Sequence, residues 1–189
     1  MIKNAASINH YPEKRWNLLY TKARQEQIAE KNLVSQGFDV YLPVIGLRRN
    51  IDGRFRYLVE PLFARYLFID LGNNHKAAKA ASINAAKPTL DKYWETLCSI
   101  YGVSSPVYFG SSIVTVSAQF ILQLRSMEHD NGIILPFSAK TTKLTEDLKS
   151  VFAAESAVER SDLLIKYLKC QSNLKSRQEA QKLNIKQAI

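Results

Sequence analysis

Hydrophobic and polar positions in the first quarter of the chain predict a strand, a helix and a second strand in close succession. Residues 15–20 (RWNLLY) form a short apolar run suited to a strand. Residues 21–37 then carry a narrow apolar stripe at helical spacing, and Gly37 stands where a C-cap glycine is expected. Residues 38–44 (FDVYLPV) alternate between apolar and polar side chains and predict the second strand.

Two further extended segments follow, and a short turn joins them. Asp52-Gly53 between two extended arms is one of the strongest short-range signals for a β-hairpin, which we place at residues 45–62. The apolar run at residues 61–71 (PLFARYLFIDL) predicts another strand, central to the sheet.

The strand predicted at residues 61–71 has bulky apolar side chains on both of its faces. Successive side chains of an extended chain point to opposite faces. One face then carries Phe63, Arg65, Leu67 and Ile69, and the other carries Ala64, Tyr66, Phe68 and Asp70. Only one of these faces is needed for the core of the domain, so the other is a candidate binding surface.

The middle of the chain predicts two more helices separated by short extended segments. A helix is expected after Pro88, then a tight turn and strand at residues 101–110, a short apolar segment at residues 112–117, and a helix that begins at Ser117. The predicted order is β-α-β-β-β-(α)-β-α. Because only the first crossover carries a clear helix, we expect an α+β fold with an antiparallel sheet flanked by helices.

The composition of the chain changes after Gly132. Residues 133–189 contain no glycine, which makes a small barrel with tight turns hard to build. Apolar residues instead recur at helical spacing and predict a helical hairpin with a frayed basic end. These residues are Leu144, Leu148, Val151 and Phe152, and then Val158, Leu164, Ile165 and Leu168. We expect a flexible leader over residues 1–14, a main domain over 15–132, a linker over 133–142 and a helical C-terminal segment over 143–189.

The charge of the chain indicates a polyanionic partner. The formal net charge is +9 over 189 residues, and the isoelectric point is near 9.5. Such an excess favours nucleic acid as the partner. No apolar run approaches the length of about 18 residues that a membrane span requires, and the N-terminus lacks the apolar core of a secretory signal. We therefore expect a cytoplasmic protein without a membrane partner.

The residue types that carry catalysis or bind metals do not form recognisable patterns. Cys98 and Cys170 lie far apart and fit neither a disulfide framework nor a zinc site. The histidines, His10, His75 and His129, have no cysteine or acidic neighbours at ligand spacing. The sequence contains no phosphate-binding loop and no nucleophile elbow. We expect no catalytic activity, no cofactor and no metal.

A series of short strings in a fixed order resembles the N-terminal domain of the NusG family, most closely its specialised RfaH-type paralogues. The resemblance covers about residues 15–130. The strings are WNLLYTKARxE at 16–26, AxxNL at 29–33, GFDVYLP at 37–43, PLFARYLFID at 61–70, YGV at 101–103 and VYFG at 107–110. Each string is weak alone, and the combination is specific because their order and spacing match.

The resemblance implies a factor that binds elongating bacterial RNA polymerase and suppresses pausing or termination. In this family one sheet surface is an apolar depression that receives the clamp helices, a coiled coil of the largest polymerase subunit. The matching positions here are Tyr20, Phe63, Tyr66 and Phe68. A rigid aromatic floor suits a docked helix tip, because aromatic anchors dominate such contacts.

The resemblance also implies a contact with the displaced non-template DNA strand. The matching positions on the first predicted helix are Lys22, Arg24, Asn32 and Gln36, and Lys87 follows from the segment SINAAK. Basic groups suit phosphates, and amides or aromatic rings suit unstacked bases. Asn32 and Ser35 stand where specialised paralogues carry base-reading His and Arg, so any sequence preference differs.

The predicted hairpin adds further positive charge. Its arms carry Arg48, Arg49, Arg54 and Arg56, which we count among the candidate nucleic-acid contacts, although a solvated arm explains them equally well. An extra segment, roughly residues 88–100, departs from the family pattern, and His75 in the preceding loop could belong to a further polymerase contact.

The C-terminal segment departs most from the family, which usually ends in a small β-barrel, the KOW domain. Residues 148–168 are similar to the later part of such a domain, but its Gly-rich entry is missing. Either the barrel has decayed into a helical hairpin, which we favour, or the segment switches state as in RfaH, where a helical tail masks the clamp-binding surface. The usual KOW partners, ribosomal protein S10 and termination factor Rho, do not carry over.

A different class of function also fits the sequence. The chain could be a free-standing basic RNA- or DNA-binding module that makes no polymerase contact. The same arginines and lysines would then bind the nucleic acid, and both faces of the strand at residues 61–71 would be ordinary core.

Overall fold

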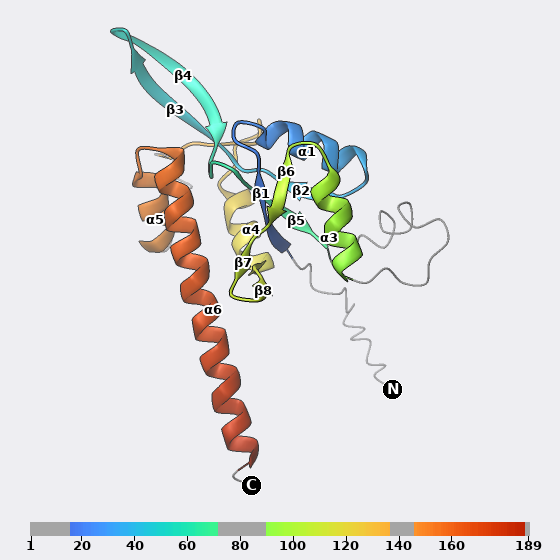
Figure 1. Ribbon diagram of the computed structural model, residues 1–189. Helices are drawn as coiled ribbons and strands as arrows, with labels where there is room; N and C mark the ends of the chain where they lie inside the picture. Colours follow the sequence, from blue (N-terminus) through green and yellow to red (C-terminus); the bar gives the residue numbers. More distant parts are fainter. Residues whose placement is uncertain (1–15, 72–89, 137–145, 188–189) are drawn as a thin grey trace, which may run out of the picture.

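The computed structural model describes residues 16–71, 90–136 and 146–187, and it has the predicted α+β fold (Figure 1). An antiparallel sheet lies next to three helices, and a long hairpin projects from it. The expected leader at residues 1–14, together with His75, Lys87 and Leu144, falls outside the described residues.

The main sheet has β5 (Tyr66–Asp70) in its interior, as the sequence predicted. Its neighbours are β1 (Trp16–Thr21) on one side and β2 (Asp39–Tyr41) on the other, both antiparallel to it. The other edge of β1 pairs with β6 (Val103–Pro106) and with β9 (Thr115–Val116). Because β5 is hydrogen-bonded on both edges, its side chains have a fixed alternation between the two faces.

The two faces of β5 contribute to two separate hydrophobic clusters. Leu67 and Ile69 pack in the first cluster with residues of α1 (Glu26–Ser35) and α3 (Leu90–Ser99). Tyr66 and Phe68 face the second cluster, which α4 (Ala118–Ser126) helps to build. Both faces of the strand are therefore covered by helices.

Local sequence signals explain where the helices begin and end. The Ser117 hydroxyl accepts a hydrogen bond from the Phe120 amide at 3.2 Å and caps the start of α4. Gly37 follows the end of α1 with φ of 85°, a backbone that glycine adopts without strain. The helix predicted from residue 21 begins later, at Glu26, because residues 22–25 form a turn in which Arg24 has a positive φ of 60°.

The predicted hairpin forms a second, three-stranded sheet that projects from the body of the protein (Figure 1). Its arms are β3 (Val44–Ile51) and β4 (Arg54–Pro61), and Asp52 and Gly53 both have positive φ in the turn, as an Asp-Gly hairpin turn requires. The third strand, β10 (Ile133–Ile134), pairs in parallel with β3. The first residues assigned to a linker are thus part of a sheet.

A smaller hairpin follows β6. Its strands, β7 (Tyr108–Phe109) and β8 (Ser112–Ile113), flank Gly110, which has a positive φ of 62°. The sequence had predicted one turn and one strand over residues 101–110, and the structure divides this region into β6 and the first arm of the small hairpin.

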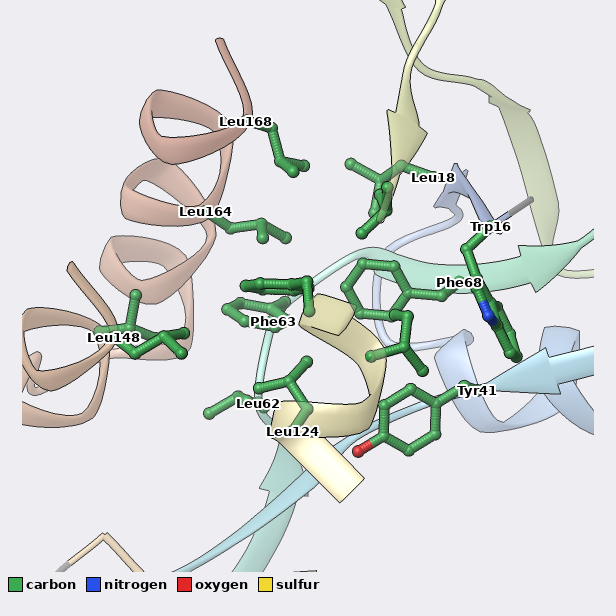
Figure 2. Close-up of a cluster of buried hydrophobic side chains, with 14 of the residues drawn as sticks. Trp16, Leu18, Tyr41, Leu62, Phe63, Phe68, Leu124, Leu148, Leu164 and Leu168 are labelled. Carbon is green, nitrogen blue, oxygen red and sulfur yellow. The ribbon is translucent and has the colours of Figure 1, made fainter. Parts of the chain in front are cut away.

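The C-terminal segment is a helical hairpin, as predicted, and we call it the tail. It consists of α5 (Glu146–Ala153) and α6 (Ala157–Gln187). Its apolar side chains are buried in the second cluster together with residues of the main domain (Figure 2). These side chains are Leu148, Val151, Phe152, Leu164 and Leu168. Val158, also part of the predicted stripe, is exposed.

Among the described residues, none of the helices combines the length and the apolar character that crossing a membrane requires.

Gly102 permits a close approach between α1 and the start of β6. It has φ of 97°, and a Cβ added there would lie 2.8 Å from the backbone nitrogen of Ala29. The left-handed backbone alone costs other residues about 1–2 kcal/mol, and overpacking adds about 1–3 kcal/mol. We expect Gly102→Ala to lower the free energy of unfolding by both amounts, as measured by urea denaturation.

Gly110→Ala is the matched control for this substitution. Gly110 also has a positive φ, but a Cβ there would meet no atom within 4 Å. The Gly110→Ala variant should therefore lose only the backbone contribution to the free energy of unfolding, about 1–2 kcal/mol. Equal losses in the two variants would contradict the importance of the contact with Ala29.

Candidate functional site

The four aromatic residues predicted to bind polymerase lie together but differ in exposure. Phe63 and Phe68 are fully buried, with their rings edge to face at a centroid distance of 6.1 Å. Tyr20 and Tyr66 are half-buried, with ring centroids 5.1 Å apart. In this state of the protein, only the two tyrosines of this set are accessible to a partner.

The position of Phe63 corrects the strict alternation expected from the sequence. Alternation would place Phe63 on the same face as Leu67, but the structure puts it in the cluster of Phe68. The cause is a turn before β5, in which the Tyr66 amide donates to the Phe63 carbonyl at 3.3 Å and Arg65 has φ of 66°. The chain is therefore not extended through residues 62–65, and the periodicity of two begins only at Tyr66.

The cluster around Phe63 and Phe68 is closed by α4 and the tail. The ring of Phe120 on α4 lies edge to face with Phe68 at 6.1 Å, and Tyr167 on α6 stacks on Phe120 at 5.3 Å. Figure 2 shows the tail leucines on one side of Phe63 and Phe68 on the other. The surface that the sequence assigned to an external partner is thus occupied by the chain's own helices.

Tyr20 and Tyr66 lie at the margin of this covered surface. The Arg65 guanidinium stacks over the Tyr20 ring at 4.1 Å, and the Arg65 amide donates to the buried Glu26 carboxylate at 2.8 Å. Burial raises the pKa of the Tyr66 hydroxyl, and the neighbouring Tyr20 and Asp162 on α6 raise it further. Both tyrosines are therefore held in place by the main domain beside the docked tail.

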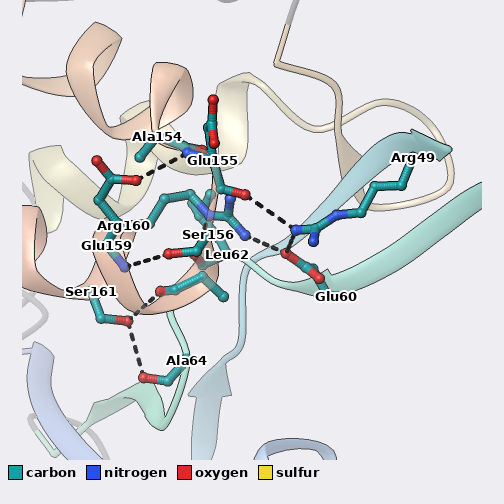
Figure 3. Close-up of polar contacts among 11 residues, drawn as sticks. Arg49, Glu60, Leu62, Ala64, Ala154, Glu155, Ser156, Glu159, Arg160 and Ser161 are labelled. Atoms are coloured by element: carbon teal, nitrogen blue, oxygen red, sulfur yellow. Dashed lines mark hydrogen bonds and ion pairs between the residues drawn. The ribbon is translucent and has the colours of Figure 1, made fainter. Parts of the chain in front are cut away.

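A buried arginine fixes the tail to the main domain (Figure 3). The Arg160 side chain is 0% exposed. Its Nε donates to the Leu62 carbonyl at 2.8 Å, one Nη donates to the Ala154 carbonyl at 3.2 Å, and the other pairs with the Glu60 carboxylate at 2.6 Å. A buried guanidinium is tolerated only when its donors find acceptors, and here three donors do so.

Residues of α6 next to Arg160 form further hydrogen bonds at the same junction. The Ser161 hydroxyl shares its hydrogen between the Ala64 carbonyl at 3.0 Å and the Ala157 carbonyl at 2.8 Å (Figure 3). The Ala64 amide donates to the Ala157 carbonyl at 3.4 Å. The two groups of the main domain in these bonds, the carbonyl and the amide of Ala64, belong to the turn before β5. The tail thus docks on the backbone beside the aromatic cluster as well as on the cluster itself.

The projecting hairpin takes part in this anchor through Arg49 on one arm and Glu60 at the base of the other. Arg49 on β3 donates to the Glu60 carboxylate at 3.1 Å and to the Glu155 carbonyl at 3.2 Å. Glu60 therefore holds two arginines, one from the hairpin and one from the tail (Figure 3). Because the Arg49 side chain is partly exposed, its pair contributes far less than the buried one.

The residues predicted to contact DNA spread over the length of α1. Lys22 and Arg24 are exposed in the turn before the helix, where the sequence had placed them on the helix itself. Asn32 is half-buried, and its amide donates to the Tyr101 carbonyl at 2.9 Å. Gln36 is exposed at the opposite end of the helix, about 15 Å from Glu26 at 1.5 Å per residue.

An exposed tyrosine that the sequence analysis did not select joins this group. Tyr101 is 61% exposed, and the Lys22 ammonium lies 5.4 Å from the centroid of its ring. The close packing of Gly102 on Ala29 holds the ring beside α1. Lys22, Asn32 and Tyr101 therefore combine a cation, an amide and an aromatic ring at one place. Its place directly before Gly102, in the turn that leads into β6, is the sequence signal that marks Tyr101 as a turn residue.

The four hairpin arginines do not form a single patch. The strand register pairs Arg49 with Arg56, which places both on the face of the hairpin toward the tail, and Arg54 shares this face. Arg48 lies on the opposite face, with its guanidinium 4.2 Å from the centroid of the Phe55 ring. Within the described parts of the chain, no group of acidic, histidine or cysteine side chains could hold a metal ion.

Comparison with known protein families agrees with this architecture. The model of the family described as "Transcription termination factor nusG" matches residues 14–125, somewhat more than half of the chain. The match includes the main sheet through β9, the projecting hairpin and nearly all of α4, and it ends before β10 and the tail. It covers a family of non-enzymatic transcription factors that interact with RNA polymerase.

The anchor residue Arg160 offers a direct test of tail docking. Arg160→Ala removes one of the two arginines on the partly exposed Glu60 and leaves the Leu62 and Ala154 carbonyls without their side-chain donor. Each unsatisfied buried acceptor costs about 1–3 kcal/mol. We expect the Ala64 amide, which bonds to the tail, to exchange its hydrogen faster, while the Tyr66 amide, which bonds within the main domain, changes less. Residue-resolved hydrogen exchange measured by NMR checks this.

Arg49→Ala serves as the matched control for that measurement. It removes the second arginine on Glu60, whose partly exposed pair is worth about 0–1 kcal/mol. Its effect on Ala64 exchange should be small. If the two variants changed this exchange equally, Arg160 would not be the main anchor of the tail.

Proposed function

The chain belongs to the NusG family, and on this premise we propose that it is a bacterial transcription elongation and antitermination regulator whose polymerase-binding surface is covered by its own tail. Family membership makes it a transcription elongation or termination factor that interacts with RNA polymerase. The observation that carries the finer proposal is the burial of Phe63 and Phe68 in a cluster completed by α4 and α6.

The shape of the tail supports the proposed partner. The clamp helices expected from the family resemblance are two antiparallel helices, and the tail that occupies this surface is also a helical hairpin. A surface that packs aromatic rings against one helical hairpin is suited to another of similar width. The tail would then act as an internal competitor for the clamp helices.

The strength of tail docking sets how much the tail lowers polymerase affinity. Complete burial of one large apolar side chain contributes about 1.5–3 kcal/mol, and the tail buries five, listed above, together with Arg160. If the open, binding-competent state is only a small fraction of the population, the apparent affinity equals the intrinsic affinity multiplied by that fraction. A partner must offset this free energy before it gains access to Phe63.

We further propose that the tail replaces the β-barrel expected at this end of a family member. Residues 148–168, which resemble part of a KOW domain, lie in α5 and α6. The helices are committed to the main domain through Arg160 and Ser161, which supports a specialised, RfaH-like regulator. Contacts that depend on an intact barrel are not expected.

The proposed DNA contact centres on the turn before α1. Lys22 and Arg24 are exposed there and suit phosphates, while Tyr101 offers a ring on which an unpaired base can stack. Asn32 positions Tyr101 because its side-chain amide donates to the Tyr101 carbonyl. Gln36 and Lys87 are contacts that we propose from the family resemblance. The non-template strand of a transcription bubble provides both phosphates and unstacked bases.

Release of the tail should increase polymerase binding. We expect Arg160→Ala in the full chain to tighten binding to bacterial RNA polymerase by about tenfold or more, because each 1.4 kcal/mol of lost docking free energy raises the open population tenfold. Adding Tyr66→Ala should remove most of this gain, since Tyr66 lies at the margin of the uncovered surface. Affinity is measured with labelled protein and core polymerase.

Tyr108→Ala in the Arg160→Ala background is the control for this experiment, because Tyr108 is an exposed aromatic residue on the separate β7–β8 hairpin. It should leave the gain intact. Polymerase binding that responds to none of these changes, in folded variants that still bind nucleic acid, would instead support the free-standing nucleic-acid-binding module.

The proposed DNA contact predicts two distinguishable effects. Lys22→Ala should weaken binding to single-stranded DNA for all sequences and reduce the slope of log affinity against log salt by about 1. Tyr101→Ala should weaken binding without changing this slope, because stacking releases no counterion. Fluorescence anisotropy over a salt series measures both effects. Lys166→Ala, at an exposed position on α6, is the control and should change neither the affinity nor the slope. Unchanged affinity in both variants would remove this contact.

A further inference from the structure

The projecting hairpin exposes a row of large side chains on one of its faces. The register pairs Gly46 with Val59, Arg48 with Tyr57 and Asn50 with Phe55, so these six residues share a face, which we call the open face. On it, Phe55 is 64% exposed and Tyr57 is 57% exposed, and Val59 is exposed as well. Contiguous exposed apolar side chains of this size mark interaction sites more often than ordinary surface.

The fold of the protein does not account for this row. The opposite face of the hairpin carries Leu47 and Leu58, both half-buried, and Leu47 packs against the second cluster. That face also holds Arg49 and Glu60, which join the anchor of the tail. The structural role of the hairpin is therefore carried by one face, while the aromatic rings lie on the other.

Two contacts hold the side chains of the open face in a defined arrangement. The Arg48 guanidinium lies over the Phe55 ring at 4.2 Å from its centroid. The Tyr57 side chain lies so close to Gly46 that a Cβ there would meet its hydroxyl oxygen at 2.0 Å. Glycine at position 46 thus leaves room for the Tyr57 ring to lie across the neighbouring strand. Rings fixed in this way lose little conformational entropy on binding.

The charge around the open face selects the chemistry of its partner. Residues 46–59 contain four arginines and one acidic residue, Asp52, which gives a formal charge of +3. Arg48, Arg54 and Arg56 are exposed, whereas Arg49 is engaged by Glu60. On the open face Arg48 lies beside the exposed rings, and Arg54 and Arg56 on the opposite face add to the positive potential of the hairpin. This combination fits a polyanion whose bases are free to stack.

We propose that the open face of the hairpin binds single-stranded RNA. Phe55 and Tyr57 are two residues apart on β4, so their backbone positions are about 6.8 Å apart along the strand and their rings can take successive unstacked bases. Arg48, the arginine of the open face, contacts phosphates, and Asn50 hydrogen-bonds a base edge. Arg54 and Arg56 lie on the opposite face and contribute only through their positive potential. In a duplex the bases are stacked inside, so their faces are closed to these rings.

Two features favour RNA over a second segment of DNA. The side-chain amide of Asn50 and the hydroxyl of Tyr57 provide donors and acceptors beside the rings, and the ribose 2′-hydroxyl can use both. Phe55 is six residues from the base of β4 at Pro61, so the hairpin carries the site up to about 20 Å from its base. The proposed DNA contact at Lys22 and Tyr101 lies on the body of the protein, so both strands can be bound together.

The test uses the full chain and three fluorescein-labelled probes of one sequence: an unstructured 12-nucleotide RNA, the matching single-stranded DNA and the matching DNA duplex. Fluorescence anisotropy should show the tightest binding for the RNA. Phe55→Ala and Tyr57→Ala should each weaken RNA binding by roughly tenfold, the expected loss for one stacked base. Arg48→Gln should reduce the salt slope by about 1, whereas Arg56→Gln on the opposite face should change it less.

Controls separate this site from other surfaces. Tyr108→Ala and Leu122→Ala remove exposed apolar side chains elsewhere and should leave RNA affinity unchanged. Because Phe55 and Tyr57 are exposed, their variants should keep the wild-type melting temperature, and Leu58→Ala on the opposite face serves as a second hairpin variant that alters packing but not the rings. RNA affinity should fall little in Leu58→Ala.

The outcomes decide between distinct partners. RNA affinity that is unaffected by Phe55→Ala and Tyr57→Ala overturns the proposal, as does equal or tighter binding of the DNA probes. If the protein binds no RNA, and Phe55→Ala and Tyr57→Ala instead weaken its binding to core RNA polymerase, the open face binds a protein and the proposal is overturned. No polymerase is needed in the RNA assay, so its result is independent of the function proposed above.

Discussion

The architecture depends on one constraint: β5 carries large apolar side chains on both faces, so both faces need cover. Leu67 and Ile69 are covered by α1 and α3, which belong to the main domain. Phe68 and the adjacent Phe63 are covered partly by α4 and partly by α5 and α6. Because apolar burial is non-directional, any helix pair with a suitable apolar stripe can provide the second cover. This makes the second face usable both as core and as a binding surface.

Directional interactions decide which helices sit there in the free protein. Arg160 donates to the Leu62 carbonyl and to Glu60, and Ser161 donates to the Ala64 carbonyl. Two of these acceptors are backbone groups of the turn before β5, so the anchor depends on the shape of that turn. Such hydrogen bonds fix the register of the tail, whereas the leucines supply most of the favourable free energy.

The three surfaces of the protein differ in chemistry because they differ in their relation to the core. The face of β5 that carries Phe68 is covered by the tail. The Lys22–Tyr101 site lies on the outside of α1, and the open face lies on a hairpin that projects from the body. Glu60 connects two of these regions, since it holds Arg49 of the hairpin and Arg160 of the tail. A substitution at Glu60 is therefore expected to weaken the anchor of the tail as well as the contact with the hairpin.

Local patterns in the sequence determined the order and type of the elements. Alternation in β5, Asp52-Gly53 in the hairpin turn, Ser117 at the start of α4 and the glycine-free helical tail each depend on neighbouring residues alone, and each prediction was confirmed. The same signals placed Tyr66 and Phe68 on a common face. Interactions within a few residues along the chain suffice for these features.

Tertiary structure alone decided which residues are accessible and which segments meet. The turn at residues 62–65 moved Phe63 to the face of Phe68, Arg160 found acceptors about a hundred positions earlier in the sequence, and Tyr101 came to lie beside Lys22. The hairpin arginines, alike in sequence, were divided between two faces by the strand register. Such contacts join residues distant in the chain, and their geometry is set by packing, which no local pattern encodes.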